Sequence, residues 1–151
     1  MTKFFAIYLA LQAIIMLAPL SPLQNAIAGF EAGLLGLARD GNVIGIAGGL
    51  FVVSASCTGL VSASVLAAII FSLKKPVLKK KLVIFATGAI ALFLLNLVRV
   101  YIVLLVAINF GSAAADLAHT ISWFSTAALI LAAWYLGMKK LIGIKDFSEL
   151  M

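Results

Sequence analysis

Long stretches without a charged residue constrain this chain more than any other feature. The longest runs from Val43 to Leu73, 31 residues in all. As a single helix it would measure roughly 46 Å, well beyond the hydrocarbon core of a bilayer, which is about 30 Å thick. The whole sequence is 65% hydrophobic and 11% charged, whereas soluble domains average about 45–50% and about 25%. These values exclude a soluble domain and predict an all-α membrane protein.

The uncharged stretches predict one membrane domain, residues 1–151, built as a bundle of four transmembrane helices. The expected spans are residues 4–20, 57–73, 82–108 and 119–138. Residues 43–56 carry three glycines and a β-branched pair, so we expect a short extended or hairpin segment at the outer surface before the second span. Strands, a re-entrant loop and an extension of the second helix all remain open for this segment.

Residues 23–38 are expected to form an external amphipathic helix. Ile27, Phe30 and Leu34 recur at helical spacing, and Glu31 and three glycines interrupt the apolar pattern, which favours an interfacial helix over a span. The first apolar run also resembles a signal peptide, because Lys3 precedes it and Ala26-Ile27-Ala28 mimics a cleavage site. At 17 residues the run is long for a signal peptide core, so a retained helix is favoured.

The basic residues predict the orientation of the chain in the cell membrane. The net charge of +6 would suggest nucleic acid in a soluble protein, but here we expect no such partner. Nine of the eleven basic residues fall on one side if both termini, the loop 74–81 and the tail 139–151 are cytoplasmic. These nine are Lys3, Lys74, Lys75, Lys79, Lys80, Lys81, Lys139, Lys140 and Lys145. The positive-inside rule selects this multi-pass topology.

In this topology three unusual residues meet at the outer level of the membrane. Cys57 and His119 are the only cysteine and histidine, and each is expected to open an inward-running helix; Arg99 is the only charge in the third span. A single cysteine is often an inert filler, and a histidine near a helix end is often only a hydrogen-bonded interface residue. A guanidinium in a membrane helix, however, costs at least about 2.5 kcal/mol, so their joint placement favours a site.

These three side chains would suit nucleophilic catalysis. At a helix amino terminus the positive end of the dipole would favour a thiolate at Cys57 and a neutral imidazole at His119. The imidazole could then take the thiol proton, while Arg99 stabilises an oxyanion or holds a carboxylate. No metal or cofactor is expected, because one cysteine, one histidine and scattered acids do not form a zinc-type spacing.

The motifs Cys57-Thr58-Gly59, Asn96-Leu97-Val98-Arg99 and His119, in this order on successive spans, resemble those of the exosortase/archaeosortase family. Members of that family are integral membrane cysteine proteases and transpeptidases, and this chain resembles a minimal member over residues 43–138. The resemblance implies Cys57 as nucleophile, His119 as proton-transfer residue and Arg99 as oxyanion or substrate-orienting residue.

Supporting roles follow from the same motifs and from spacing. Asn96 shares a helix face with Arg99 and could brace the guanidinium or the substrate. Thr58 and Gly59 complete the cysteine motif, although Leu60-Val61 stands where an arginine often follows in the family. Asp116, three residues before His119, is either a residue that polarises the imidazole or a solvated loop acid.

The resemblance also implies a reaction at the outer face of the membrane. Its substrates would be secreted proteins ending in a short motif, a hydrophobic helix and a basic tail. A thioester on the enzyme would pass the new carboxyl end to an amine, with a membrane lipid as one acceptor, or to water. A small transporter or channel and a non-catalytic assembly partner are the alternatives. The motif recognised, the acceptor and the oligomeric state stay open.

Overall fold

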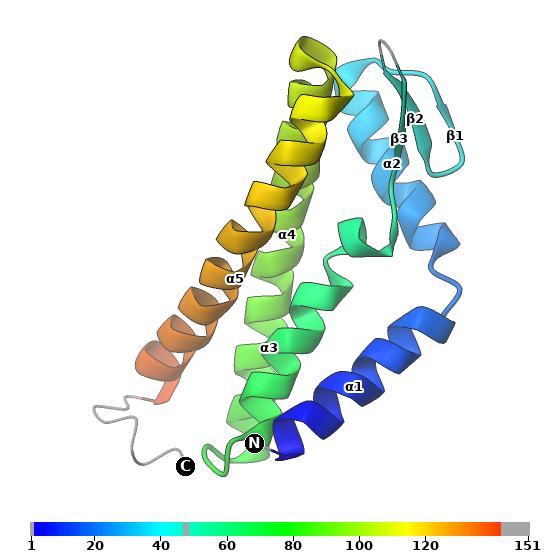
Figure 1. The fold of residues 1–151 in the computed structure, drawn as a ribbon. Coiled ribbons are helices and arrows are strands. Elements are labelled where there is room, and N and C mark those ends of the chain that lie inside the picture. The colour runs from blue at the N-terminus through cyan, green and yellow to red at the C-terminus, as the bar shows by residue number, and fades with distance from the viewer. Residues whose placement is uncertain (1, 47–48, 143–151) are drawn as a thin grey trace.

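The computed structural model describes residues 2–46 and 49–142, and this part of the chain is mainly helical (Figure 1). The helices are α1 (Thr2–Leu17), α2 (Ser21–Leu35), α3 (Leu60–Ser72), α4 (Leu78–Phe110) and α5 (Ser112–Ile142). Helices α4 and α5 run side by side, joined at Gly111, and α3 packs against both. The predicted cytoplasmic tail, 139–151, lies outside the described residues beyond position 142.

The segment expected to be extended contains a small sheet and a turn of 3-10 helix. Strands β1 (Arg39–Asp40), β2 (Val43–Ile46) and β3 (Gly49–Val52) form an antiparallel sheet in the order β1-β2-β3. Ile44 pairs with Phe51 in the β2–β3 ladder. The turn η1 (Ala55–Thr58) follows β3 and leads into α3. The chain thus reaches Cys57 from a hairpin rather than from a continuous helix.

Helix length supports fewer spans than the four predicted. Among the described residues, α4 with 33 residues and the 29 residues Ser112–Lys140 of α5 are long and apolar enough to cross a membrane. Helices α1 and α2 pass the same test only as a pair, bent by 79° at the break between them. Helix α3 has 13 residues, short of the about 20 that a span requires. The structure therefore supports two spans, or three if the bent pair is one.

Two helix boundaries differ from the expected ones. Helix α4 begins at Leu78, so the last lysines of the predicted loop, Lys79 to Lys81, lie in its first turn. Helix α5 begins at Ser112, so the predicted loop before His119 is helical. The only break between α4 and α5 is Gly111, whose φ of +85° ends one helix, and the alanines that follow favour a new helix at once.

Helix α2 packs against the rest of the protein through only part of its predicted apolar face. Phe30 and Leu34, expected on the apolar face, are more than half exposed. The face turned inward instead carries Ile27, Ala28, Glu31 and Ala32. The two alanines allow the helix to approach its neighbours closely, and the larger apolar side chains point outward, where a membrane would cover them.

A cluster of buried side chains joins α2, the strands, η1 and α4. Its members are Ile27, Ala28, Ala32, Ile44, Val53, Cys57, Val100 and Leu104. Cys57 is thus packed into the core where these elements meet. The cluster fixes the position of η1 against α4.

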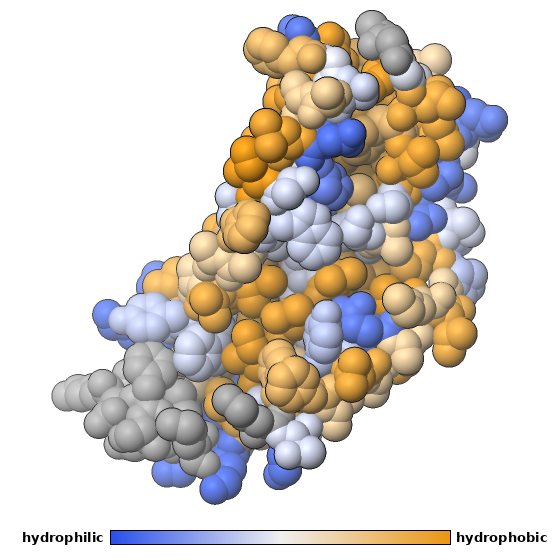
Figure 2. Space-filling view, in the orientation of Figure 1, coloured by the Kyte–Doolittle hydropathy of each residue, from blue (hydrophilic) through white to orange (hydrophobic). Residues whose placement is uncertain are grey.

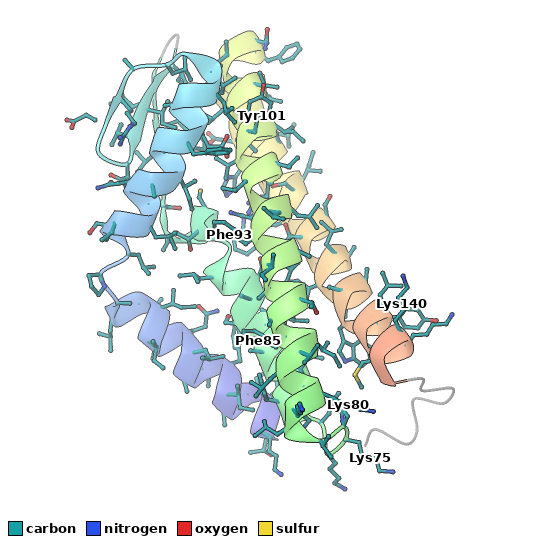
Figure 3. All side chains as sticks on the ribbon, turned by 180° about the vertical axis from the view of Figure 1, so that it is seen from behind. Lys75, Lys80, Phe85, Phe93, Tyr101 and Lys140 are labelled. Atoms are coloured by element: carbon teal, nitrogen blue, oxygen red, sulfur yellow. The ribbon has the colours of Figure 1, made fainter. Side chains whose placement is uncertain are left out.

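The surface is consistent with a membrane protein whose basic residues gather at one end. Figure 2 shows a mainly hydrophobic face, with a small hydrophilic patch between the upper part of α5 and the strands. Lys75, Lys80 and Lys140 lie at the same end of the molecule (Figure 3). The first residues of α1 and the last turn of α5 lie at that end too, opposite the sheet (Figure 1).

Candidate active site

Cys57 lies in the turn η1, three residues before the first residue of α3. Its side chain is only 2% exposed, and its Sγ atom lies 3.7 Å from Ser54 Oγ. Its backbone N–H donates to Ser54 O at 3.0 Å, which closes the turn. The prediction that Cys57 opens the helix is therefore wrong, and the dipole of α3 does not act on the thiol as directly as a first-turn position would allow.

The residues around Cys57 hold its backbone in place. Thr58 is fully buried, and its Oγ1 donates to Ala55 O at 2.6 Å. Gly59 has φ +76°, in the left-handed region, and a Cβ atom there would lie 3.4 Å from Asn96 Cβ. Asn96, on α4, donates from Nδ2 to the carbonyl oxygen of Cys57 at 2.6 Å. Thr58 and Gly59 thus shape the turn, and Asn96 braces the cysteine rather than Arg99.

Arg99 makes its contacts with α5. Its Nε donates to Ser122 Oγ at 2.6 Å, and its Nη2 lies 3.2 Å from His119 Nε2. The Cζ atom lies 5.5 Å from the centre of the Trp123 ring, a cation–π distance. The arginine is therefore held by one stretch of α5.

His119 lies two turns inside α5, seven residues after Ser112. It is not at a helix amino terminus, so the dipole argument made for its charge state fails. The geometry gives a different reason for a neutral ring. A guanidinium only donates hydrogen bonds, so Nε2 must accept from Arg99, and the neutral imidazole then carries its proton on Nδ1.

Asp116 lies in α5, one turn before His119, and its side chain is exposed. No hydrogen bond joins its side chain to that of His119 in the described part of the chain. The same part contains no group of three or more histidine, cysteine or acidic side chains that could hold a metal ion.

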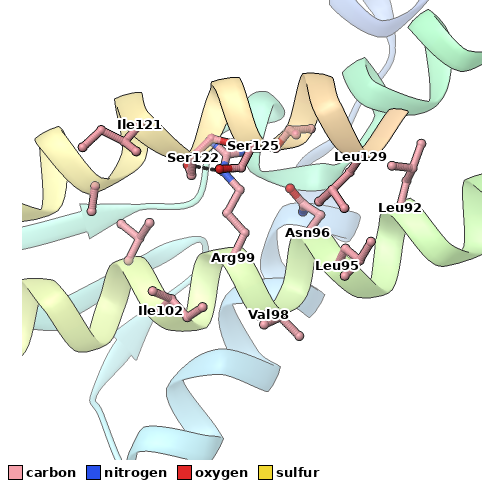
Figure 4. A pocket seen from close by; sticks show the side chains of 13 residues that line it. Leu92, Leu95, Asn96, Val98, Arg99, Ile102, Ile121, Ser122, Ser125 and Leu129 are labelled. Atoms are coloured by element: carbon pink, nitrogen blue, oxygen red, sulfur yellow. Dashed lines mark hydrogen bonds between the residues drawn. The ribbon is translucent and has the colours of Figure 1, made fainter. Parts of the chain in front are cut away.

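A cavity of about 470 Å³ lies between α4 and α5 beside the arginine. Figure 4 shows Arg99 reaching from α4 toward Ser122 and Ser125, with Asn96 one turn away. Most of the remaining lining is apolar: Leu92, Leu95, Val98, Ile102, Val103, Ala118, Ile121 and Leu129, with Thr126 as a further polar member. A guanidinium thus faces a space that otherwise suits apolar groups.

The structure brings Cys57, Asn96, Arg99 and His119 into one cluster, although they come from three separate segments. No hydrogen bond joins Cys57 Sγ to His119 within the described ranges. Ser122, which bonds Arg99, was not predicted from the sequence. Its position three residues after His119, on the same helix face, was the available signal.

The comparison with family models decides the assignment. The model of the transmembrane exosortase matches residues 2–137, which covers most of the chain and all of the cluster. The chain belongs to the transmembrane exosortase family. Comparisons with curated proteins and with solved structures gave no significant match. Family membership points to a membrane protease or transpeptidase, and in this exosortase the matched residues include Cys57, Arg99 and His119.

Proposed function

We propose that this exosortase is a membrane cysteine protease and transpeptidase in which Cys57 attacks a peptide bond. The observation that carries the proposal is the Arg99–His119 hydrogen bond of 3.2 Å beside a cysteine that Asn96 holds by its backbone. A thiol, an imidazole and a permanent cation in one cluster are the groups that acyl transfer through a thioester requires.

The first step is proton transfer from Cys57 to His119. The lone pair of His119 Nε2, which would take the thiol proton, is engaged by Arg99 in the free enzyme. A substrate carbonyl oxygen that accepts the Nη2–H of Arg99 releases this lone pair. Substrate binding then also frees the base, because the hydrogen that the substrate oxygen accepts is the one that leaves His119.

The thiolate then attacks the carbonyl carbon, and the resulting oxyanion accepts hydrogen bonds from Arg99. A guanidinium has five N–H donors. Ser122 takes the Nε hydrogen, so the Nη hydrogens, including the one that leaves His119, can serve the oxyanion. When the carbon–nitrogen bond breaks, the imidazolium of His119 gives its proton to the leaving amine, and a thioester remains on Cys57.

In the second half of the reaction an amine or water attacks the thioester. His119 takes a proton from the attacking group, and the thiolate of Cys57 leaves. With an amine acceptor, such as a lipid that carries an amino group, the product is an amide, and with water it is a free carboxylate. We further propose secreted substrates that end in a motif, a hydrophobic helix and a basic tail.

The proposed site lies at the outer face of the membrane, with both termini in the cytoplasm. The lysines at the end of the molecule opposite the sheet support this orientation, because basic residues favour the cytoplasmic side (Figure 3). A substrate whose basic tail stays in the cytoplasm would then present the peptide preceding its helix to Cys57.

Co-expression with a tagged secreted protein carrying such a terminal signal tests the proposal. The parent chain should shorten the substrate, and Cys57→Ala should leave it at full length. Thr120→Ala, a change at an exposed residue of α5, is the control and should process normally. Processing by Cys57→Ala at the parent rate would refute the cysteine mechanism, and solute flux through proteoliposomes of that variant would favour the transporter alternative.

A further inference from the structure

Ser122 makes two short hydrogen bonds that link Arg99 to His119. Its Oγ donates to the carbonyl oxygen of His119 at 2.6 Å and accepts from Nε of Arg99 at 2.6 Å. The first bond is ordinary, since serine and threonine in helices commonly bond a carbonyl three or four residues earlier. The second joins α5 to α4, and it is what distinguishes Ser122 from the other hydroxyl residues of the helix.

The helix bond fixes the direction of the hydroxyl. Because the hydrogen of Ser122 points at its own helix, the oxygen lone pairs are left for Arg99. Thr120 and Thr126 also donate to carbonyl oxygens four residues earlier, at 2.9 Å and 2.8 Å. Neither threonine bonds to Arg99 in the described part of the chain, so both lack the contact between helices.

The hydrogen bond from Arg99 Nε to Ser122 restricts the orientation of the whole guanidinium group. The guanidinium is rigid, so an acceptor at Nε and an aromatic ring at 5.5 Å from Cζ together define where its plane lies. The two Nη groups then point away from Ser122, one of them toward His119. With Nε held, a small tilt of the guanidinium suffices for Nη2 to exchange His119 for another acceptor while the cation stays in place.

We propose that Ser122 is a positioning residue that anchors Arg99 between its resting acceptor, His119, and the substrate oxygen. This inference rests on the proposed function, since it assigns Arg99 to the reacting carbonyl. Ser122 does not itself contact the reacting atoms. It acts by keeping the guanidinium at one place in the cavity while the Nη hydrogens change partner.

The test compares processing by Ser122→Ala, Ser122→Thr and the control Thr120→Ala over a range of substrate concentrations up to saturation. Removing an acceptor from a charged donor should lower kcat about 10- to 100-fold, with little change in KM. Ser122→Thr keeps the hydroxyl and should recover most of the rate. Thr120→Ala loses an intrahelical bond of the same kind and should stay within about 2-fold of the parent, since a surface bond of this type contributes little.

A double variant separates positioning from a loss of folding. Lysine has no Nε–H group, so in an Arg99→Lys chain the additional change Ser122→Ala should lower the rate no further. If Ser122→Ala lowers the rate of the Arg99→Lys chain as much as it lowers the parent rate, the inference is wrong. It is also wrong if Ser122→Ala processes at the parent rate while Cys57→Ala is inactive. In both cases the proposed function still stands. Full processing by Cys57→Ala would overturn both.

Discussion

Asn96 on α4 donates a hydrogen bond of 2.6 Å to the carbonyl oxygen of Cys57, 39 residues earlier in the chain. The amide is buried, with 6% of the residue exposed. It therefore ties the turn η1 to a long helix that also carries Arg99, one turn away. The position of the candidate nucleophile relative to the cation depends on this bond.

Replacing Asn96 should lower both stability and activity. In Asn96→Ala the carbonyl of Cys57 loses its partner inside the protein, which should cost about 1–3 kcal/mol. Thermal unfolding in detergent should show a lower midpoint, and substrate processing should slow. Asn109→Ala is the matched control, because Asn109 lies exposed on the same helix and bonds only a carbonyl of its own helix. Equal midpoints for the two variants would contradict the bracing role.

Gly59 should not tolerate a side chain. Its φ of +76° is unfavourable for other residues, although an added Cβ would lie at an ordinary contact distance from Asn96. Gly59→Ala should therefore cost about 1–2 kcal/mol, because of the left-handed conformation. Gly33→Ala, at an exposed helical position with open space around it, should be neutral or stabilising. Unfolding midpoints measure the contrast, and a Gly59→Ala chain as stable as Gly33→Ala would contradict it.

Arg99→Lys should lose most of the activity although it keeps the charge. Lysine offers a single ammonium group, so it cannot bond Ser122, His119 and a substrate oxygen from a fixed plane. We expect kcat to fall about 10²- to 10³-fold, the usual effect of removing an oxyanion donor. Arg39→Lys, at the exposed strand β1, should process at the parent rate. If Arg99→Lys does so too, charge alone suffices and the planar guanidinium is not required.

Glu31 should destabilise the protein. It is fully buried, and neither carboxyl oxygen has a hydrogen-bond partner among the described residues. Glu31→Leu removes an unsatisfied polar group from an apolar surrounding and should raise stability by about 1–3 kcal/mol. A higher unfolding midpoint with normal processing is the expected result. A lower midpoint would contradict it, and lost processing in a stable variant would assign Glu31 a function.

The chemistry-bearing residues could be predicted because they are rare. In a chain with so few polar groups, one cysteine, one histidine and one arginine within an apolar helix stand out. The positions of the lysines then predict which side of the membrane each loop occupies. This reasoning predicted that Cys57, Arg99 and His119 share one level of the molecule. The structure joins Arg99 to His119 and joins Cys57 to Asn96, one turn from Arg99; the shared catalytic role stays a prediction. The reasoning required only helix rise and the cost of charge in a membrane.

The local settings of these residues could not be predicted in the same way. The helix that carries His119 extends back to Ser112, because a single glycine, Gly111, is enough to end α4 and let α5 begin. Contacts between residues far apart in the sequence determine the other local settings. Ser122 is one of many small polar residues in the sequence, and only the position of α4 shows that it faces Arg99.

Trapping the thioester tests the central claim most directly. Hydroxylamine added during processing should intercept the acyl group on Cys57, and mass spectrometry of the shortened substrate should then find a carboxy-terminal hydroxamate. Cys57→Ala should give no hydroxamate. A product that carries only a free carboxylate at every hydroxylamine concentration, or a hydroxamate formed by Cys57→Ala, would contradict catalysis through Cys57.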